Sequence, residues 1–379
     1  MRKETIKRKS CYLCTTPLQV LGAIALEKEK QEGADIFLFD DNSDYLSLGS
    51  RLRAANIFEN VYCIDFYSSM KRKSKTAAQA VSFFRMAACS RYVNRVTGDS
   101  VTYEKLYSSS AAVSKMVVAS GLYKKNPSMK VSMCDDGIGS YSKAGRVKTG
   151  SALFQKAKRI LKWKDILEKP EAIYLYQPEL YESESETDVR RMPVMRLSSD
   201  SSRLAGIFTD ENPDSLLIRE KILIFDTFRS QSSNAEALAA LDEVYRYLGE
   251  TFGADELILK EHPRSTVRTE APMKKYAYTS VPIEIVYMRQ PELEDKILLA
   301  LNSTAVFTPK MLFGAEPHVI LLYRLVSKDP EIRKKRDDTF LHLRSLYEDQ
   351  SRFCIPETFE ELKAAITEWR SESGEGSRG

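Results

Sequence analysis

Two adjacent carboxylates, Asp135 and Asp136, directly follow the apolar run KVSMC (130–134) and precede Gly137. Such a run predicts a buried strand, and α/β proteins bind ligands at the carboxyl ends of parallel strands. Neighbouring side chains leave a strand on opposite sides, so one carboxylate can face a ligand while the other holds the loop. We expect Asp135 to act as a catalytic base with Asp136 in support, and an ordinary Asp-Gly turn is the alternative.

A histidine, a proline and an arginine follow a second apolar run, ELILK (256–260). His262 titrates near neutrality, and it could protonate or hydrogen-bond a departing phosphate. Pro263 fixes the local backbone, and the guanidinium of Arg264 can bind phosphate oxygens in a bidentate manner. This pattern predicts a phosphate site, with a purely structural histidine as the alternative.

Further candidates for binding are hydroxyls and one acid. Ser303 and Thr304 follow another apolar run, where they can hold an anion or cap a helix. Glu284 lies within VPIEIVYM (281–288), which we predict to be a strand. A charge there needs a partner such as ribose hydroxyls, unless that face meets solvent. Thr16, where the first strand gives way to a helix, completes the candidate binding residues.

These residues lie in two series of alternating strands and helices, the pattern of parallel, doubly wound sheets. Strands are expected at 11–15, 34–41, 60–66, 104–110 and 130–137, and then at 221–228, 256–263, 281–288, 298–307 and 318–323. We predict an N-terminal Rossmann-like, acceptor-side domain (1–180), a polar linker (181–214) and a C-terminal Rossmann-like, nucleotide-sugar-binding domain (215–379). Its final helix packs either on its own domain or back on the first. This is a GT-B-like α/β architecture, with two domains facing across a cleft.

Composition excludes several classes of protein. The 379 residues are 43% hydrophobic and 29% charged, which excludes a disordered chain, and a net charge of +4 does not indicate a duplex DNA binder. Neither a GxGxxG nor a GxxxxGK[ST] loop occurs, which disfavours dinucleotide oxidoreductases and P-loop ATPases. The CxxC at Cys11 and Cys14 lacks a second ligand pair, so we expect no metal and no cofactor. No apolar stretch reaches the roughly 18 residues that span a bilayer, so we expect a cytoplasmic protein.

The order of these pieces resembles the bacterial sialyltransferases of glycosyltransferase family 52, the lipooligosaccharide sialyltransferase group. The resemblance spans most of the chain, and its specific parts are CYLCTTPLQVLGAIALE, KLYSSSAAVSKMVVASGLYKKNPSMKVSMCDDGIGSY, and LKEHPRS followed by PIEI and NSTA. Bacterial sialyltransferases of several families share an acidic-acidic-glycine motif, a His-Pro motif and a later serine-threonine motif. Matching residues occur here in that order: Asp135-Asp136-Gly137, His262-Pro263 and Ser303-Thr304.

The resemblance implies a GT-B fold, CMP-sialic acid as the donor, and metal-independent transfer with inversion at the anomeric centre. Our leading hypothesis is that His262, Arg264, Ser303 and Thr304 contact the leaving phosphate and that Glu284 binds the ribose. A carboxylate after the first strand of the second domain has also been regarded as the base in this family. Asp226 lies in that vicinity, so it is the rival to Asp135.

Two other functions stay open at this point. One is transfer of a hexose from another nucleotide sugar, and the other is a non-catalytic glycan- or nucleotide-binding protein of GT-B shape. The expected partners are a nucleotide sugar and a galactose-terminated glycan of lipooligosaccharide or capsule, which can be lipid-linked, without nucleic acid. The basic N-terminal peptide and the basic amphipathic segment 151–164 suggest peripheral contact with the inner face of the cell membrane, with a solvated surface helix as the alternative. A homodimer is also left open.

Overall fold

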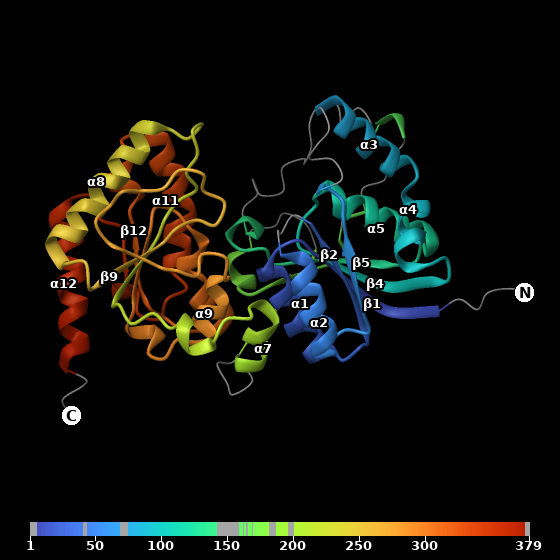
Figure 1. Ribbon diagram of the computed structural model, residues 1–379, viewed down its shortest axis with the longest axis horizontal. Helices are drawn as coiled ribbons and strands as arrows, with labels where there is room; N and C mark the ends of the chain where they lie inside the picture. Colours follow the sequence, from blue (N-terminus) through green and yellow to red (C-terminus); the bar gives the residue numbers. More distant parts are fainter. Residues whose placement is uncertain are drawn as a thin grey trace, which may run out of the picture. The chain divides into compact units, whose positions relative to one another are not determined.

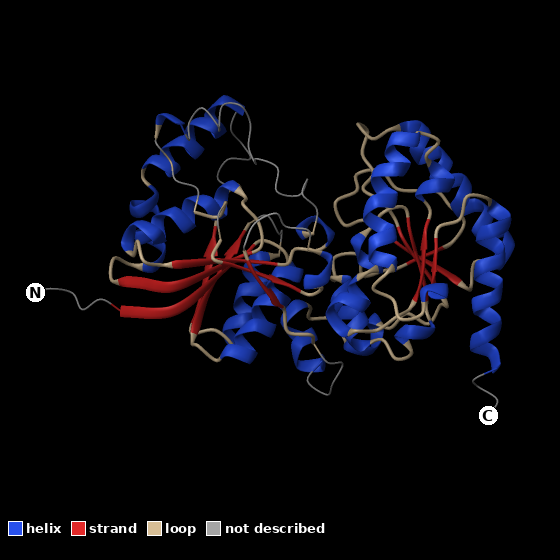
Figure 2. Ribbon diagram, turned by 180° about the vertical axis from the view of Figure 1, so that it is seen from behind, coloured by secondary structure: helices blue, strands red, loops and turns tan. Residues whose placement is uncertain are grey.

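The computed structural model describes residues 6–40, 44–68, 75–141, 159–161, 163, 166–168, 170–181, 187–195 and 201–375 (Figures 1 and 2). The chain divides into two compact units, Met1–Val194 and Met195–Gly379. Each unit contains one parallel β-sheet with helices packed against it. We describe the units separately.

The sheet of the first unit has the strand order β3-β2-β1-β4-β5-β6-β7, and all its neighbouring strands are parallel. The strands are β1 (Ile6–Cys14), β2 (Ala34–Phe39), β3 (Asn60–Ile64), β4 (Val101–Ser108), β5 (Lys130–Cys134), β6 (Ala172–Leu175) and β7 (Asp188–Arg191). The helices are α1 (Pro17–Lys30), α2 (Tyr45–Ala55), α3 (Lys75–Ala87), α4 (Cys89–Thr97) and α5 (Val113–Lys125). The order reverses between β1 and β4, the switch point at which doubly wound sheets bind ligands.

The local sequence explains how α1 begins where β1 ends. Thr16 is the N-cap of α1, and its hydroxyl accepts a hydrogen bond of 3.3 Å from the Gln19 amide. Pro17 occupies the first turn, where its missing N–H is not needed. Helices lie on both sides of the sheet, with α1 and α2 on one face and α4 and α5 on the other (Figure 1).

The sheet of the second unit has the order β10-β9-β8-β11-β12-β13, again with parallel neighbours. Its strands are β8 (Ile222–Phe225), β9 (Leu257–Lys260), β10 (Lys274–Lys275), β11 (Ile297–Ala300), β12 (His318–Leu321) and β13 (Phe353–Cys354). The longer helices are α7 (Ser201–Phe208), α8 (Ala235–Phe252), α9 (Ile283–Arg289), α11 (Pro330–Arg344) and α12 (Phe359–Glu375), and α10 (Tyr323–Val326) is a single turn. The switch point lies between β8 and β11.

The predicted fold class, α/β with two Rossmann-like domains, is confirmed by these two strand orders. The boundary between the units falls inside the stretch 181–214, which we expected to be a linker. Part of that stretch belongs to the units themselves, because β7 completes the first sheet and α7 packs on α9 in the second unit.

The predicted strand at 281–288 is wrong, because Ile283–Arg289 forms helix α9. Its β-branched residues favour a strand by propensity, but Pro282 precedes the helix as its N-cap. Ile283, Val286 and Tyr287 are all buried, and so are their neighbours on other faces of this short helix. A helix buried almost all round leaves no helical period in its sequence.

The last helix, α12, belongs to the second unit and packs on other elements of that unit. Its Trp369 stacks on His318 of β12 with ring centroids 4.5 Å apart, and Arg370 lies over the ring of Phe252 in α8. Most of the basic segment 151–164 lies outside the described residues. Within the part of the chain that the structure describes, no helix combines the length and apolar character needed to cross a membrane.

Candidate functional site

In the first unit, Asp135 is buried, and both oxygens of its carboxylate accept hydrogen bonds. Its carboxylate accepts hydrogen bonds from the backbone amides of Gly137 (2.8 Å) and Tyr176 (3.1 Å) and from the Tyr141 hydroxyl. Only 4% of its surface is exposed, and burial raises the pKa of Asp135 to about 6 despite these three donors. The carboxylate of Asp135 ties the loop after β5 to the segment after β6.

The next carboxylate, Asp136, is part-exposed and contacts α1, the helix that follows β1. Its Oδ1 accepts a hydrogen bond of 2.7 Å from Nε2 of Gln19 in α1. Burial raises the pKa of Asp136, whereas the Gln19 hydrogen bond and the charge of Lys115 lower it. Of the two adjacent acids, Asp136 is the more exposed, and it is therefore the better candidate for proton transfer.

The turn that follows the two acids has a backbone conformation that requires glycine at position 137. Gly137 has φ +93°, a conformation that side chains other than glycine rarely adopt. The Asp136 amide donates a hydrogen bond of 2.8 Å to the Ser140 hydroxyl. The acidic-acidic-glycine motif thus forms a tight turn that buries one carboxylate and leaves the other part-exposed.

Sequence reasoning missed three residues of this site. Gln19 has the helical spacing of its apolar neighbours, and Lys115 lies in the apolar segment VSKMVVAS, but both side chains are buried. Tyr141 holds Asp135 from a position six residues on. The one available signal was Lys115, because a lysine within so apolar a helix needs a buried partner.

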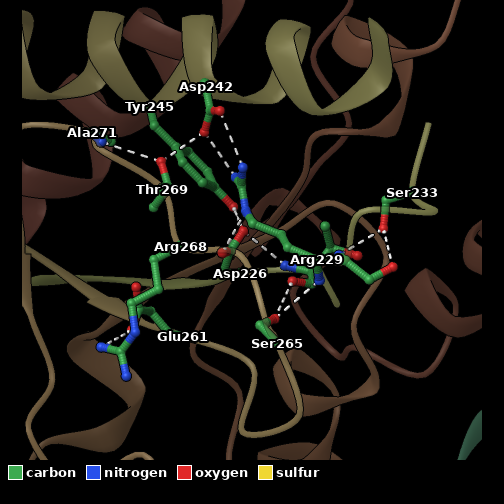
Figure 3. A network of polar contacts seen from close by, with 12 residues as sticks. Asp226, Arg229, Ser233, Asp242, Tyr245, Glu261, Ser265, Arg268, Thr269 and Ala271 are labelled. Atoms are coloured by element: carbon green, nitrogen blue, oxygen red, sulfur yellow. Dashed lines mark hydrogen bonds and ion pairs between the residues drawn. The ribbon is translucent and has the colours of Figure 1, made fainter. Parts of the chain in front are cut away.

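In the second unit, Asp226 follows β8 and belongs to a buried network of polar side chains (Figure 3). Its carboxylate accepts hydrogen bonds from Arg229 Nε (2.7 Å) and the Tyr245 hydroxyl (3.1 Å). Arg229, which is 2% exposed, also forms an ion pair of 2.8 Å with Asp242 of α8. Asp226 is 4% exposed. Its oxygens are thus committed to holding Arg229, which disfavours its role as the base.

His262 is the second residue of the loop after β9 and is part-exposed. The backbone amide of Arg264 donates a hydrogen bond of 3.2 Å to Nδ1 of His262, so in the neutral ring Nε2 carries the proton. Burial and the neighbouring charges of Arg264 and Lys260 lower the pKa of His262, which also favours the neutral ring. The geometry therefore makes Nε2–H a hydrogen-bond donor and disfavours a charged acid.

The His262 loop is joined to the loop after β8. The Arg229 amide donates to the Ser265 hydroxyl at 3.0 Å, and the Thr266 amide donates to the Arg229 carbonyl at 2.9 Å. The ring of Phe228, 47% exposed, lies edge-on to His262 with centroids 5.7 Å apart. These contacts place the His262 imidazole beside the switch point of the second sheet.

The remaining predicted residues of this unit lie at strand ends or close to them. Pro263 and Arg264 are exposed, and the Arg264 guanidinium forms no ion pair with a residue that the structure describes. Ser303 follows β11 and caps a short helical turn, because its hydroxyl accepts a hydrogen bond of 3.2 Å from the Ala305 amide. Thr304 is exposed beside it. Their hydroxyl groups lie at the switch-point end of β11.

Glu284 lies in the first turn of α9, where burial raises its pKa and the charge of Lys260 lowers it. Lys260, the last residue of β9, is 7% exposed, and burial lowers its pKa to about 8. Its Nζ donates to the carbonyls of Tyr278 (3.3 Å) and Thr279 (3.2 Å), which lie in the segment leading to α9. Lys260 thereby links the end of β9 to the segment that carries Glu284.

The structure places Thr16, Asp135, Asp136 and Gly137 in the first unit, and Asp226, His262, Pro263, Arg264, Glu284, Ser303 and Thr304 in the second. Among the described residues, no three His, Cys, Asp or Glu side chains come together as a metal ion would require. Burial also raises the pKa of Cys14 to about 12, so the CxxC provides no reactive thiolate there.

No family model and no curated protein sequence matches the chain. Among solved structures, it is similar to CalG4, the calicheamicin glycosyltransferase, with a TM-score of 0.49 and 11% identity over 98% of this chain and 90% of that one. The spinosyn rhamnosyltransferase SpnG, complexed with thymidine diphosphate, matches with a TM-score of 0.40 and 12% identity over 96% and 95% of the two chains. An α,α-trehalose-phosphate synthase (UDP-forming) from Burkholderia vietnamiensis gives 0.40 and 10% over 96% and 100%. At these values, the fold assignment rests on the strand order within each unit.

Proposed function

We propose that the chain is an inverting, metal-independent glycosyltransferase that transfers sialic acid from CMP-sialic acid to a galactose-terminated bacterial surface glycan. One observation carries the proposal. At the strand ends of the second unit, His262 presents a donor Nε2–H next to the guanidinium of Arg264, which forms no ion pair with any residue that the structure describes. Such a site stabilises the negative charge of a departing phosphate. The choice of CMP-sialic acid and of the acceptor rests on the resemblance of the three ordered motifs.

We assign the base to Asp136 and a positioning role to Asp135, the reverse of the roles expected from the sequence. Asp136 takes the proton of the acceptor hydroxyl, and the acceptor oxygen forms a bond to the anomeric carbon from the side opposite the phosphate. The bond between that carbon and the phosphate oxygen breaks, and CMP leaves with the electron pair. Nε2–H of His262 and the Arg264 guanidinium then hold the phosphate oxygens, while Glu284 binds the ribose.

Ser303 and Thr304 supply further hydroxyl groups for the phosphate, and Thr16 and Gly137 belong to the acceptor side. We further propose that the protein acts at the cytoplasmic side of the membrane on a glycan that is still being assembled. The hexosyltransferase alternative uses the same phosphate site, so the identity of the donor must be measured.

The test is to measure hydrolysis and transfer for a panel of nucleotide sugars, with CMP-sialic acid beside UDP- and TDP-hexoses. Turnover of CMP-sialic acid alone supports the proposal. Turnover of a hexose donor instead identifies a hexosyltransferase, whereas binding without turnover of any donor indicates a non-catalytic binding protein.

Replacing His262 with Ala is expected to lower transfer roughly 10- to 100-fold, the effect of losing one hydrogen bond to a charged group. The loss should be similar at neutral and at alkaline pH, because the lowered pKa of His262 favours the neutral ring there. Steady-state kinetics from neutral to alkaline pH check this. A wild-type rate that declines as the imidazole loses its proton would instead show that His262 acts as a charged acid.

Transfer is expected to survive chelation, because the proposal gives the phosphate charge to His262, Arg264 and hydroxyl groups. We expect kcat in EDTA to stay within about two-fold of its value without EDTA, on the grounds that no step uses a metal ion. Loss of activity in EDTA, with recovery on adding magnesium or manganese, would make Asp135 and Asp136 metal ligands.

A further inference from the structure

Gln19 has only one orientation of its side-chain amide. It lies in the first turn of α1 and is 3% exposed. Its Oε1 accepts hydrogen bonds from the Thr15 amide (2.7 Å), the Thr15 hydroxyl (3.0 Å) and Lys115 Nζ (2.7 Å). Because these groups are donors, an oxygen must face them. Nε2 is therefore turned to Asp136, to which it donates at 2.7 Å.

Lys115 lies in the first helical turn of α5 and is fully buried. Its Nζ also donates to the Ser110 hydroxyl at 3.2 Å, so it joins α5, the loop after β4 and α1. Burying an ammonium group costs free energy unless nearby groups stabilise its charge. A carboxylate stabilises that charge more strongly than the neutral oxygens of Gln19 and Ser110 do. The arrangement places the positive charge on one side of the Gln19 amide and the carboxylate of Asp136 on the other.

We propose that Gln19 and Lys115 are positioning residues that keep Asp136 ionised and aimed at the acceptor hydroxyl. This inference rests on the proposed function, in which Asp136 is the base. Neither residue needs to touch the substrate. Gln19 fixes the carboxylate through one hydrogen bond, and Lys115 fixes Gln19 while its charge offsets that of Asp136.

The charged and titratable groups that face Asp136 come from three elements. Lys115 of α5 lowers the pKa of Asp136, whereas Asp135, the preceding residue, is a like charge whose own pKa Asp136 raises. The thiol of Cys14 at the end of β1 stays protonated, because burial raises its pKa to about 12. Burial raises the pKa of Asp136, so the network opposes that rise. Without the network, Asp136 would be ionised only at higher pH.

The sharpest variant is Gln19→Glu, because it keeps oxygens for Thr15 and Lys115 but replaces the donor to Asp136 with a second carboxylate. We expect the acidic limb of the kcat/KM profile to move to higher pH and transfer on that limb to fall roughly 10- to 100-fold. Circular dichroism should show that the variant is folded at the temperature of the assay. Lys115→Met should move the limb in the same direction, while Lys124→Met, at an exposed position of the same helix, should leave it in place.

A second readout does not depend on catalysis. NMR titration of protein labelled with ¹³C-aspartate, with the signal assigned through Asp136→Asn, should show Asp136 titrating at higher pH in Gln19→Glu. An unmoved kinetic limb and an unmoved titration in a folded Gln19→Glu protein would overturn the inference. If the wild type turns over no nucleotide sugar, the proposed function fails, and the titration still decides whether Gln19 and Lys115 control Asp136.

Discussion

Asp136→Asn is expected to lower transfer roughly 100- to 10,000-fold, the range for loss of general base catalysis. The amide keeps the size of the side chain but cannot accept the proton. Nucleotide affinity should stay within a few-fold, because the base contacts the acceptor and the nucleotide is assigned to residues of the second unit. Calorimetry with CMP and transfer assays with excess acceptor measure the two effects separately.

The matched control is Asp135→Asn. The carboxylate of Asp135 accepts from Gly137, Tyr176 and Tyr141, and the NH₂ group of an asparagine would face one of these donors. We expect that variant to lose about 1–3 kcal/mol of stability, the cost of a buried donor left unpaired. If Asp135→Asn is folded and inactive while Asp136→Asn stays active, the roles first expected from the sequence are correct.

Asp226→Asn is expected to lower the free energy of unfolding by about 3 kcal/mol, the lower end of the range for removing one partner of a buried ion pair. Arg229 would remain buried with Asp242 as its one remaining ion-pair partner among the described residues, and the side chain of Asp242 is 34% exposed. Urea denaturation followed by circular dichroism measures the change. Asp214→Asn, in an exposed ion pair with Arg289 at 3.3 Å, serves as the control and should cost at most about 1 kcal/mol.

The same variant decides between the two candidate bases. Under our proposal, Asp226→Asn keeps transfer within a few-fold at temperatures where the protein is folded, because Asp226 holds Arg229 and touches no acceptor. A stable Asp226→Asn protein without activity would move the base to the second unit. In that case the acidic-acidic-glycine motif would only shape the loop after β5.

Most strands could be predicted because they are short apolar runs bounded by polar or glycine residues. The turn at Asp135–Gly137 and the position of His262 after β9 follow from the same pattern, since strand ends in a parallel sheet gather at one edge. Helix α9 could not be predicted in this way, because burial on nearly all faces removes its helical period. Likewise, β7 is an edge strand of exposed and part-exposed residues, so its sequence has no apolar run.

The different roles of Asp135 and Asp136 could not be predicted from the sequence for another reason. Which of two adjacent carboxylates is buried depends on partners distant in the chain, Tyr176 for one and Gln19 for the other. Asp226 poses the same problem, because its partners Arg229 and Tyr245 come from a loop and a helix whose packing no local pattern records. A motif identifies acids at strand ends, but three-dimensional partners decide what each acid does.

The hydrogen bonds that join the loops after β8 and β9 have a thermodynamic consequence. Fixing one residue of a flexible loop costs about 1–2 kcal/mol in conformational entropy. In this protein the Arg229 amide and carbonyl already hold Ser265 and Thr266, so the turn that presents His262 and Arg264 is ordered by the fold. A ligand that binds this turn therefore does not have to order it, and more of its contact energy remains as affinity.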